Sequence, residues 1–270
     1  MARAQTKVEA WRCYGRLLKL FREQKRLTQT ELAEAVGYSY EHTASVEQGR
    51  RPAKLDFTEA VERVLPANGT LLALQDEVEL AKLPDFFQDF AKLEAEAVSR
   101  FEYEPQIVPG LLQTEAYARS VLAGHCPPLD EETREQHLEA RLGRQRLLTR
   151  TPLVQFSFIL WEPVLRNPVG GTGTLGAQLR RLAGLKEQPN VELQVLPGDY
   201  GMHPGLNGPM VLLETNAHRQ VGYVESQEVG CVISEPHKVS AFALRYGKLR
   251  SLALSMEESA RLIERVVEEL

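Results

Sequence analysis

The chain has 270 residues, of which 43% are hydrophobic and 26% charged, and its formal net charge is −5. This length predicts about two domains, and the composition is that of an ordinary globular protein. No apolar run approaches the ~20 residues that a membrane-spanning helix needs, and the N-terminus lacks the apolar segment of a signal peptide. The cysteines are odd in number and far apart: Cys13, Cys126 and Cys231. We therefore expect a cytoplasmic protein with reduced thiols and no membrane contact.

The first predicted element is an amphipathic helix over residues 11–26. Apolar residues recur in it at helical spacing, with Arg and Lys between them. These apolar residues are Trp11, Tyr14, Leu17, Leu18 and Phe21.

A short helix with clear ends follows. Thr28 and Glu31 form a capping box, in which each side chain bonds to the other residue's backbone amide. Its apolar face consists of Leu32, Ala33 and Val36. Gly37 comes next, where a left-handed residue ends a helix without steric cost.

A second short helix is predicted over residues 40–48, with Ser39 as its N-cap and Gly49 at its end. The residues expected to face the core are Thr43, Val46 and the aliphatic part of Glu47. The residues expected on the other side are Tyr40, Glu41, Ala44, Ser45 and Gln48. Two short helices that meet at such a corner can place the second one in the major groove of DNA.

Further helical residues complete a small all-α bundle of about 65 residues. The apolar ones are Leu55, Phe57, Ala60, Val61, Val64 and Leu65. The alternative is a bundle that uses the same corner for packing only. Two caps, a glycine and an arginine pair at the required offsets favour the DNA-binding interpretation.

Residues 14–65 resemble the Cro/repressor-type helix-turn-helix family, also called the xenobiotic-response-element family. The shared features are Gln29 after the first cap, Leu32-Ala33, the corner Gly37 and Glu47-x-Gly-Arg-Arg51. The resemblance implies that bases are read by Tyr40, Glu41 and Ser45. It implies that the DNA backbone is contacted by Gln29, Tyr38, Ser39, His42, Gln48, Arg50, Arg51 and Lys54. It also implies a structural ion pair between Arg22 and Glu47.

Glu41 departs from the family pattern, because an acid repels phosphate. Its carboxylate can accept a hydrogen bond from cytosine N4, so we interpret it as a hint of a cytosine contact and leave the operator sequence open.

The distribution of charge along the chain indicates how many copies bind one DNA site. Residues 1–65 hold 12 Lys and Arg against 9 Asp and Glu, and the other residues hold 20 against 28. Because residues 1–65 carry only a small positive charge, one copy can contact few phosphates. We therefore predict that a homodimer binds a two-fold DNA site.

Residues 67–100 are predicted to be connecting helices, over 70–82 and 84–99, which Pro84 separates. Residues 101–270 alternate between helical and strand patterns. The predicted helices are one capped by Thr114, then 130–149, 174–186, 235–254 and one opened by the Ser255–Glu258 capping box. The predicted strands are 153–160, 191–196, 209–214 and 221–225. We expect a mixed α/β domain with one small sheet.

Residues 86–267 resemble the domain of unknown function that follows such helix-turn-helix domains in actinobacterial, WhiJ-like regulators. The segments that carry this resemblance are 108–119, Glu162-x-x-Leu-Arg166, 178–182, 190–197 and 253–255. The resemblance implies an architecture but no established chemistry. It also implies a small protein partner as an alternative to a small-molecule effector.

Few motifs favour an enzyme. Gly171-x-Gly173-x-x-Gly176 satisfies the dinucleotide fingerprint, but Pro163 and Pro168 lie between the preceding strand and the glycines, so a flexible loop is the simpler interpretation. No His has a second His or Cys at metal-ligand spacing. We expect no catalytic residue, no metal and no cofactor. A candidate ligand pocket would contain Glu162, Arg166 and His203, although Glu162 and Arg166 at helical spacing could simply pair with each other.

The sequence thus predicts a multi-domain α+β protein. Residues 1–66 form an N-terminal all-α helix-turn-helix bundle, 67–100 connect, and 101–270 form a mixed α/β domain that receives a signal or dimerises. The predicted function is a dimeric, sequence-specific DNA-binding transcriptional regulator. One alternative is the antidote of a two-protein module that represses its own gene. Another is a nucleotide-binding enzyme with a DNA-binding head.

Overall fold

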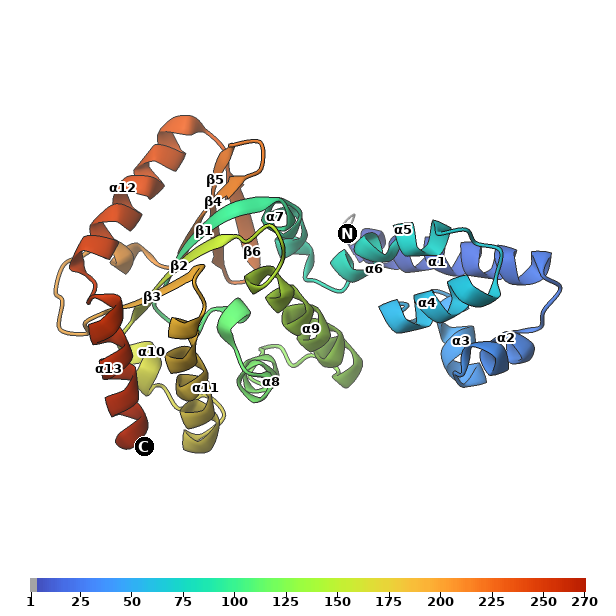
Figure 1. Ribbon diagram of the computed structural model, residues 1–270, viewed down its shortest axis with the longest axis horizontal. Coiled ribbons are helices and arrows are strands. Elements are labelled where there is room, and N and C mark those ends of the chain that lie inside the picture. The colour runs from blue at the N-terminus through green and yellow to red at the C-terminus, as the bar shows by residue number, and fades with distance from the viewer. Residues whose placement is uncertain (1–3) are drawn as a thin grey trace. The chain divides into compact units, whose positions relative to one another are not determined.

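The computed structural model describes residues 4–270, so the first three residues of the predicted 1–66 domain lie outside the described part. The chain forms two compact units, one ending at Gln88 and one beginning at Asp89. The first unit is helical and the second is a mixed α/β domain (Figure 1). This confirms the predicted fold class. We call the two units the head and the body.

The head consists of short helices packed on one long helix. They are α1 (Ala4–Gln24), α2 (Gln29–Val36), α3 (Tyr40–Glu47), α4 (Leu55–Val64), α5 (Thr70–Ala73) and α6 (Gln75–Leu80). The predicted apolar faces meet in one core, in which Tyr14, Leu18 and Leu32 are fully buried. A buried polar chain crosses this core: the Tyr14 hydroxyl bonds to Thr58 Oγ1 (2.8 Å), which donates to Gln75 Oε1 (2.7 Å).

The segment predicted as a separate connector over 67–100 is divided between the two units. Leu71 of α5 and Val78 of α6 are buried in the head core, and the Trp11 indole donates to Val78 O (3.3 Å). The next helix, α7 (Asp85–Ala95), enters the body, where Phe90 stacks on Tyr223 with ring centroids 4.1 Å apart. The connecting helices therefore have no core of their own, since each buries its apolar side in a neighbouring unit.

The body is built on one six-stranded sheet. Its strands are β1 (Ala97–Glu104), β2 (Gln155–Trp161), β3 (Val191–Leu196), β4 (Met210–Thr215), β5 (Gln220–Ser226) and β6 (Val229–Ile233), in the order β3-β2-β1-β4-β5-β6. The pairs β1–β2 and β2–β3 are parallel, whereas β4, β5 and β6 continue antiparallel from β1. Four strands confirm the predicted ones, but β1 and β6 were not predicted. Residues 97–99, predicted to be helical, begin β1.

Helices cover both faces of the sheet. They are α8 (Glu115–Ala123), α9 (Glu131–Arg144), α10 (Pro163–Arg166), α11 (Thr172–Gly184), α12 (Pro236–Leu252) and α13 (Met256–Glu268). Figure 1 shows α12 on one side of the sheet and α8, α9 and α11 on the other. Phe242, Tyr246 and Leu249 of α12 pack on Tyr103 and Ile159 of the sheet. The predicted caps Thr114 and Ser255 are both confirmed.

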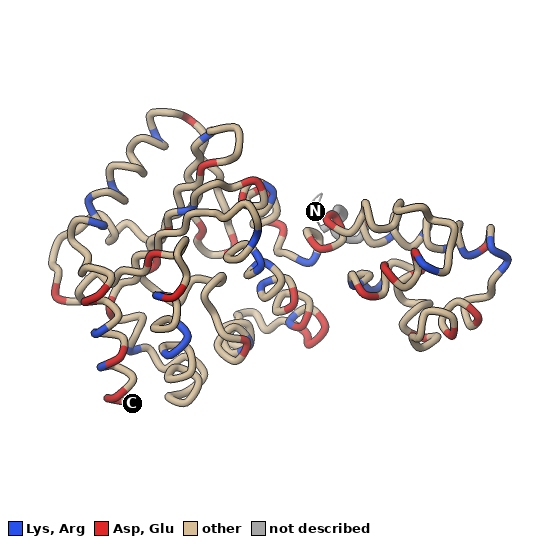
Figure 2. Tube along the Cα trace, in the orientation of Figure 1, with Lys and Arg blue, Asp and Glu red and all other residues tan. Residues whose placement is uncertain are grey.

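A buried cluster of charges joins α7, β1 and α9. Arg144 donates from Nε and Nη2 to the two carboxylate oxygens of Glu94, both at 2.8 Å. Arg100 lies between two acids, with Nε 3.3 Å from Glu94 Oε1 and Nη2 3.0 Å from Glu102 Oε2. The first turn of α9 contains Glu131 and Glu132 and its last turn Arg141 and Arg144, as the helix dipole favours; Figure 2 shows the charged residues along this helix.

Candidate nucleic-acid interface

The corner between α2 and α3 is fixed by local hydrogen bonds. Thr28 Oγ1 accepts from Glu31 N (3.2 Å), and Glu31 Oε2 accepts from Thr28 N (2.7 Å), which confirms the capping box. Gly37 ends α2 with φ 76°, a left-handed conformation that favours glycine. Ser39 Oγ then accepts from His42 N (3.1 Å) and opens α3. Each end of the corner is therefore determined by residues no more than three positions apart.

The inner side of α3 packs closely on α1. A Cβ atom at Gly15 would lie only 2.3 Å from Glu47 O, so the two helices can approach this closely only because residue 15 has no side chain. Thr43, Val46 and Glu47 are buried, as predicted. Ala44, predicted to face outward, is only 4% exposed. The prediction was wrong because α3 contacts both α1 and α2, so its buried arc is wider than one helical face.

Arg22 and Glu47 form the predicted ion pair, and both are buried. Arg22 Nε donates to Glu47 Oε2 (2.7 Å), and Nη2 donates to Oε1 (2.8 Å). Arg22 Nη1 also donates to Leu27 O (2.7 Å) just before α2. Gln29 adds a bond that the sequence did not predict, from its Nε2 to Glu47 Oε1 (2.8 Å). The pair thus ties α1, the start of α2 and the end of α3 together.

The outer side of α3 carries most of the residues that were assigned to DNA. Tyr40 is 49% exposed although it is a large aromatic residue. Ser45 and Tyr38 are half-buried. The other exposed residues in this group are Ser39, Glu41, Gln48, Arg50, Arg51 and Lys54. These residues therefore share an accessible surface formed by α3 and the loop that follows it.

The side chain of His42 packs against neighbouring aromatic rings. Its ring stacks on Tyr38 with centroids 5.0 Å apart and meets the edge of Phe57 at 5.2 Å. Its Nε2 is buried and has no hydrogen-bond partner among the described residues, and its backbone amide donates to Ser39 Oγ. Burial lowers the pKa of His42, and Arg51 and Lys54 lower it further. In this arrangement the His42 ring supports the packing of the corner.

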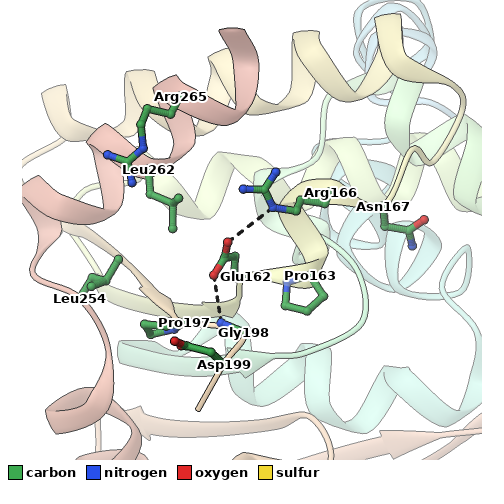
Figure 3. A pocket seen from close by; sticks show the side chains of 10 residues that line it. All are labelled: Glu162, Pro163, Arg166, Asn167, Pro197, Gly198, Asp199, Leu254, Leu262 and Arg265. Carbon is green, nitrogen blue, oxygen red and sulfur yellow. Dashed lines mark hydrogen bonds and ion pairs between the residues drawn. The ribbon is translucent and has the colours of Figure 1, made fainter. Parts of the chain in front are cut away.

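The body contains an open pocket of about 970 Å³ at the carboxyl ends of the parallel strands β2 and β3 (Figure 3). Such strand ends are common ligand sites in α/β folds. Glu162 accepts from Gly198 N (3.0 Å) and lies 3.5 Å from Arg166. Arg166 Nη1 also donates to Glu269 (2.6 Å). The pocket lining consists of Glu162, Pro163, Arg166, Asn167, Pro197, Gly198, Asp199, Leu254, Leu262 and Arg265.

His203 does not line this pocket, so the predicted grouping with Glu162 and Arg166 was wrong. It is 4% exposed, and its ring centroid lies 6.4 Å from that of Tyr103 and 6.1 Å from that of Trp161.

The glycine motif Gly171-x-Gly173-x-x-Gly176 is also not the flexible loop that was expected. Gly171 precedes α11, and Gly173 and Gly176 lie inside that helix. Helix α10 separates the motif from β2, so the motif lacks the direct strand-to-glycine turn of a dinucleotide site.

The capped corner and the exposed face of α3 define a helix-turn-helix domain, a class of fold that binds DNA. Residues 14–75 match a family model described as a helix-turn-helix domain, which confirms the predicted class and suggests a DNA-binding regulator rather than an enzyme. A second family model, described as Domain of unknown function (DUF5753), matches residues 87–265. This match covers more than half of the chain, so the protein belongs to the family that carries this domain. No curated protein and no solved structure matches the chain.

None of the helices within residues 4–270 combines the length and the apolar character that crossing a bilayer requires.

Proposed function

We propose that the protein is a sequence-specific transcriptional regulator that binds a two-fold operator as a dimer and receives a signal through its body. The observation that carries the proposal is the exposed outer side of α3, held at a rigid corner by the buried Arg22–Glu47 pair. An α-helix fits the width of the major groove, and the exposed outer side of α3 can face the bases there. The exposed basic residues beside it would contact phosphates, which position the protein without reading sequence.

The assignment of residues follows their exposure. Tyr40, Glu41 and Ser45 would read bases from α3. The residues that would contact the backbone are Gln29, Tyr38, Ser39, Gln48, Arg50, Arg51 and Lys54. The side-chain amide of Gln29 already donates to Glu47 of α3. A phosphate bound by Gln29 would therefore be linked through this hydrogen bond to the end of α3. We leave His42 out of the contact set, since its ring packs against Tyr38 and Phe57.

The proposal is tested by titrating labelled DNA from upstream of the gene with the full chain at several salt concentrations. We expect a complex that excess unrelated DNA does not displace and that weakens steeply with salt, because phosphate contacts release counterions. A protein that binds all DNA equally, or none, contradicts the proposal.

Two kinds of substitution separate the proposed roles. Arg50→Ala is expected to weaken binding to every sequence and to lower the salt slope by about one unit, because one phosphate contact is lost. Tyr40→Ala and Ser45→Ala are expected to change preference at particular base pairs by about 1–3 kcal/mol each and to keep the salt slope. Arg63→Ala removes the same charge from the exposed last turn of α4 and is the matched control. If Arg63→Ala and Arg50→Ala behave alike, the assigned surface is wrong.

For the signal, the pocket at the ends of β2 and β3 is the candidate site. It offers two guanidinium groups, Arg166 and Arg265, and two carboxylates, Glu162 and Asp199, between apolar walls. A small molecule with both charged and apolar parts would fit this chemistry. An effector that binds here should shift the operator titration in the wild type and not in an Arg265→Ala variant.

A further inference from the structure

The two edges of the sheet in the body differ in how their backbone groups are satisfied. At the β3 edge, Val195 O accepts from Leu254 N (2.9 Å) and Val195 N donates to Ser259 Oγ (2.9 Å). The side chain of Gln194 donates to Leu254 O (2.7 Å). Leu254, between α12 and α13, and Ser259 of α13 therefore satisfy the outward backbone groups of Val195 at this edge. Closure matters because bare N–H and C=O groups along an edge pair readily with another chain.

The opposite edge, β6, has no comparable cover. Within residues 4–270, no backbone group of another segment bonds to its outer side. The strand reads Val229-Gly-Cys-Val-Ile233 and lacks the charged residues and prolines that usually protect an exposed edge. Val229 is 67% exposed, and the thiol of Cys231 is exposed as well. One edge of the same sheet is thus covered by another segment at Val195, while the β6 edge is exposed and apolar.

The hairpin geometry identifies the free groups of β6. Gln227 and Glu228 both have positive φ (49° and 62°), which is typical of a two-residue type I′ turn. Such a turn makes the flanking Ser226 and Val229 a hydrogen-bonded pair. Because hydrogen-bonded and non-bonded pairs alternate along an antiparallel ladder, Cys231 directs its backbone groups toward Val224 of β5. Gly230 and Val232 direct theirs toward the free edge.

We propose that β6 is the dimerisation edge of the protein, and that two copies pair there antiparallel, β6 against β6. This inference uses the proposed function only for its expectation of a dimer. A strand that pairs antiparallel with its own copy generates two-fold symmetry, which is the symmetry of a two-half-site operator. No residue of β6 itself is charged, so the paired strands place no like charges directly opposite each other.

The register follows from the length of the strand. A two-fold axis at Cys231, the middle residue, pairs all of Val229–Ile233, and every other register leaves residues unpaired. Gly230 of each copy then lies opposite Val232 of the other, so the outward donors and acceptors of both residues are satisfied. The two Cys231 residues form a non-hydrogen-bonded pair with Cα atoms about 4.5 Å apart. A strand this short buries less than the ~1,200 Å² of a stable interface, so the dimer should depend on concentration and strengthen when both heads hold one DNA molecule.

Disulfide trapping tests the register. In a Cys13→Ser/Cys126→Ser variant only Cys231 remains, and a Cα separation of about 4.5 Å permits a disulfide. We expect mild copper–phenanthroline oxidation to give a covalent dimer on a non-reducing gel. The matched control moves the thiol, by adding Cys231→Ser and Val229→Cys. Residue 229 is two positions from the axis, so its copies lie four residues apart, about 13 Å, and should not cross-link. Equal yields from both variants, or no dimer from Cys231, would overturn the proposal.

A proline substitution tests the edge without a cross-link. Val232→Pro removes an N–H that points outward and leaves the β5–β6 ladder intact, whereas Val232→Ala keeps that N–H. By sedimentation velocity, Val232→Pro should be monomeric at concentrations where the wild type and Val232→Ala dimerise, with an unchanged unfolding curve. If Val232→Pro still dimerises, another surface is responsible. Neither experiment contains DNA, so a failure here leaves the operator titration to judge the proposed function separately.

Discussion

Glu47→Ala is expected to destabilise the head by about 3–5 kcal/mol, the usual cost of removing one partner of a buried ion pair. The substitution leaves the guanidinium of Arg22 buried without a carboxylate and removes two of its hydrogen bonds and that of Gln29. Because α3 is tied to α1 and α2 through this carboxylate, DNA binding should be lost together with stability. The chain has two tryptophans. Urea unfolding followed by Trp11 fluorescence, in a Trp161→Phe background, therefore reports on the head.

Two controls distinguish the ion pair from a general loss of charge. Glu23 lies 3.8 Å from the same arginine but is 56% exposed, so Glu23→Ala should cost less than about 1 kcal/mol. An Arg22→Met/Glu47→Leu double variant replaces both charges by apolar groups and should recover most of the lost stability. If Glu47→Ala costs no more than Glu23→Ala, the pair does not hold the corner.

Glu94→Gln is expected to destabilise the body by a similar amount, about 3–5 kcal/mol. Glu94 is 2% exposed and is the shared partner of Arg144 and Arg100. Burial by itself would raise the pKa of Glu94, but the two arginines outweigh it and hold the pKa below its usual range. The carboxylate is therefore the form that the folded body prefers. Urea unfolding followed by Trp161 fluorescence, in a Trp11→Phe background, measures the effect.

The neighbouring Glu102 provides a matched control with the opposite expectation. Burial raises the pKa of Glu102, and Arg100 offsets this only in part. Because the charged form of Glu102 is less favoured than that of Glu94, the Glu102→Gln substitution should cost less stability than Glu94→Gln at neutral pH. Equal costs for the two glutamines would contradict the charge assignment.

The pH dependence of the Glu94→Gln cost follows from the lowered pKa. A depressed folded-state pKa stabilises the protein above the unfolded-state pKa, near 4.3 for glutamate. This contribution disappears as the pH falls through the lower pKa of the folded state. The difference between wild type and Glu94→Gln should therefore be full at neutral pH and shrink in acid.

The capped ends of helices in the head and in the body were predictable because the interactions that set them are local. The bonds of Thr28, Ser39, Thr114 and Ser255 join residues three positions apart, so the sequence contains both partners side by side. The same holds for Gly37, whose left-handed conformation depends only on its own missing side chain. Strands β2 to β5 were found because they are rich in the apolar and β-branched residues of strands.

Strand β1 was missed because it carries charged residues inward. Arg100 and Glu102 interrupt its apolar pattern, and the sequence around them does not show that they have partners. Arg100 pairs with Glu94 of α7 and with Glu102 on the same strand, and Glu94 is in turn bonded by Arg144 of α9, 50 residues away. At the interface, the burial of Ala44 and of the His42 ring was likewise decided by helices that pack from a distance.

Residues a few positions apart set the corner and the caps, since backbone conformation and capping bonds are local, and helical spacing predicted the exposed side of α3 except at Ala44. Tertiary structure alone decided which charged side chains could be buried and which sheet edge stayed open. Both depend on groups distant in the chain, because a buried charge is tolerated only beside its partner and an edge is closed only where another segment reaches it.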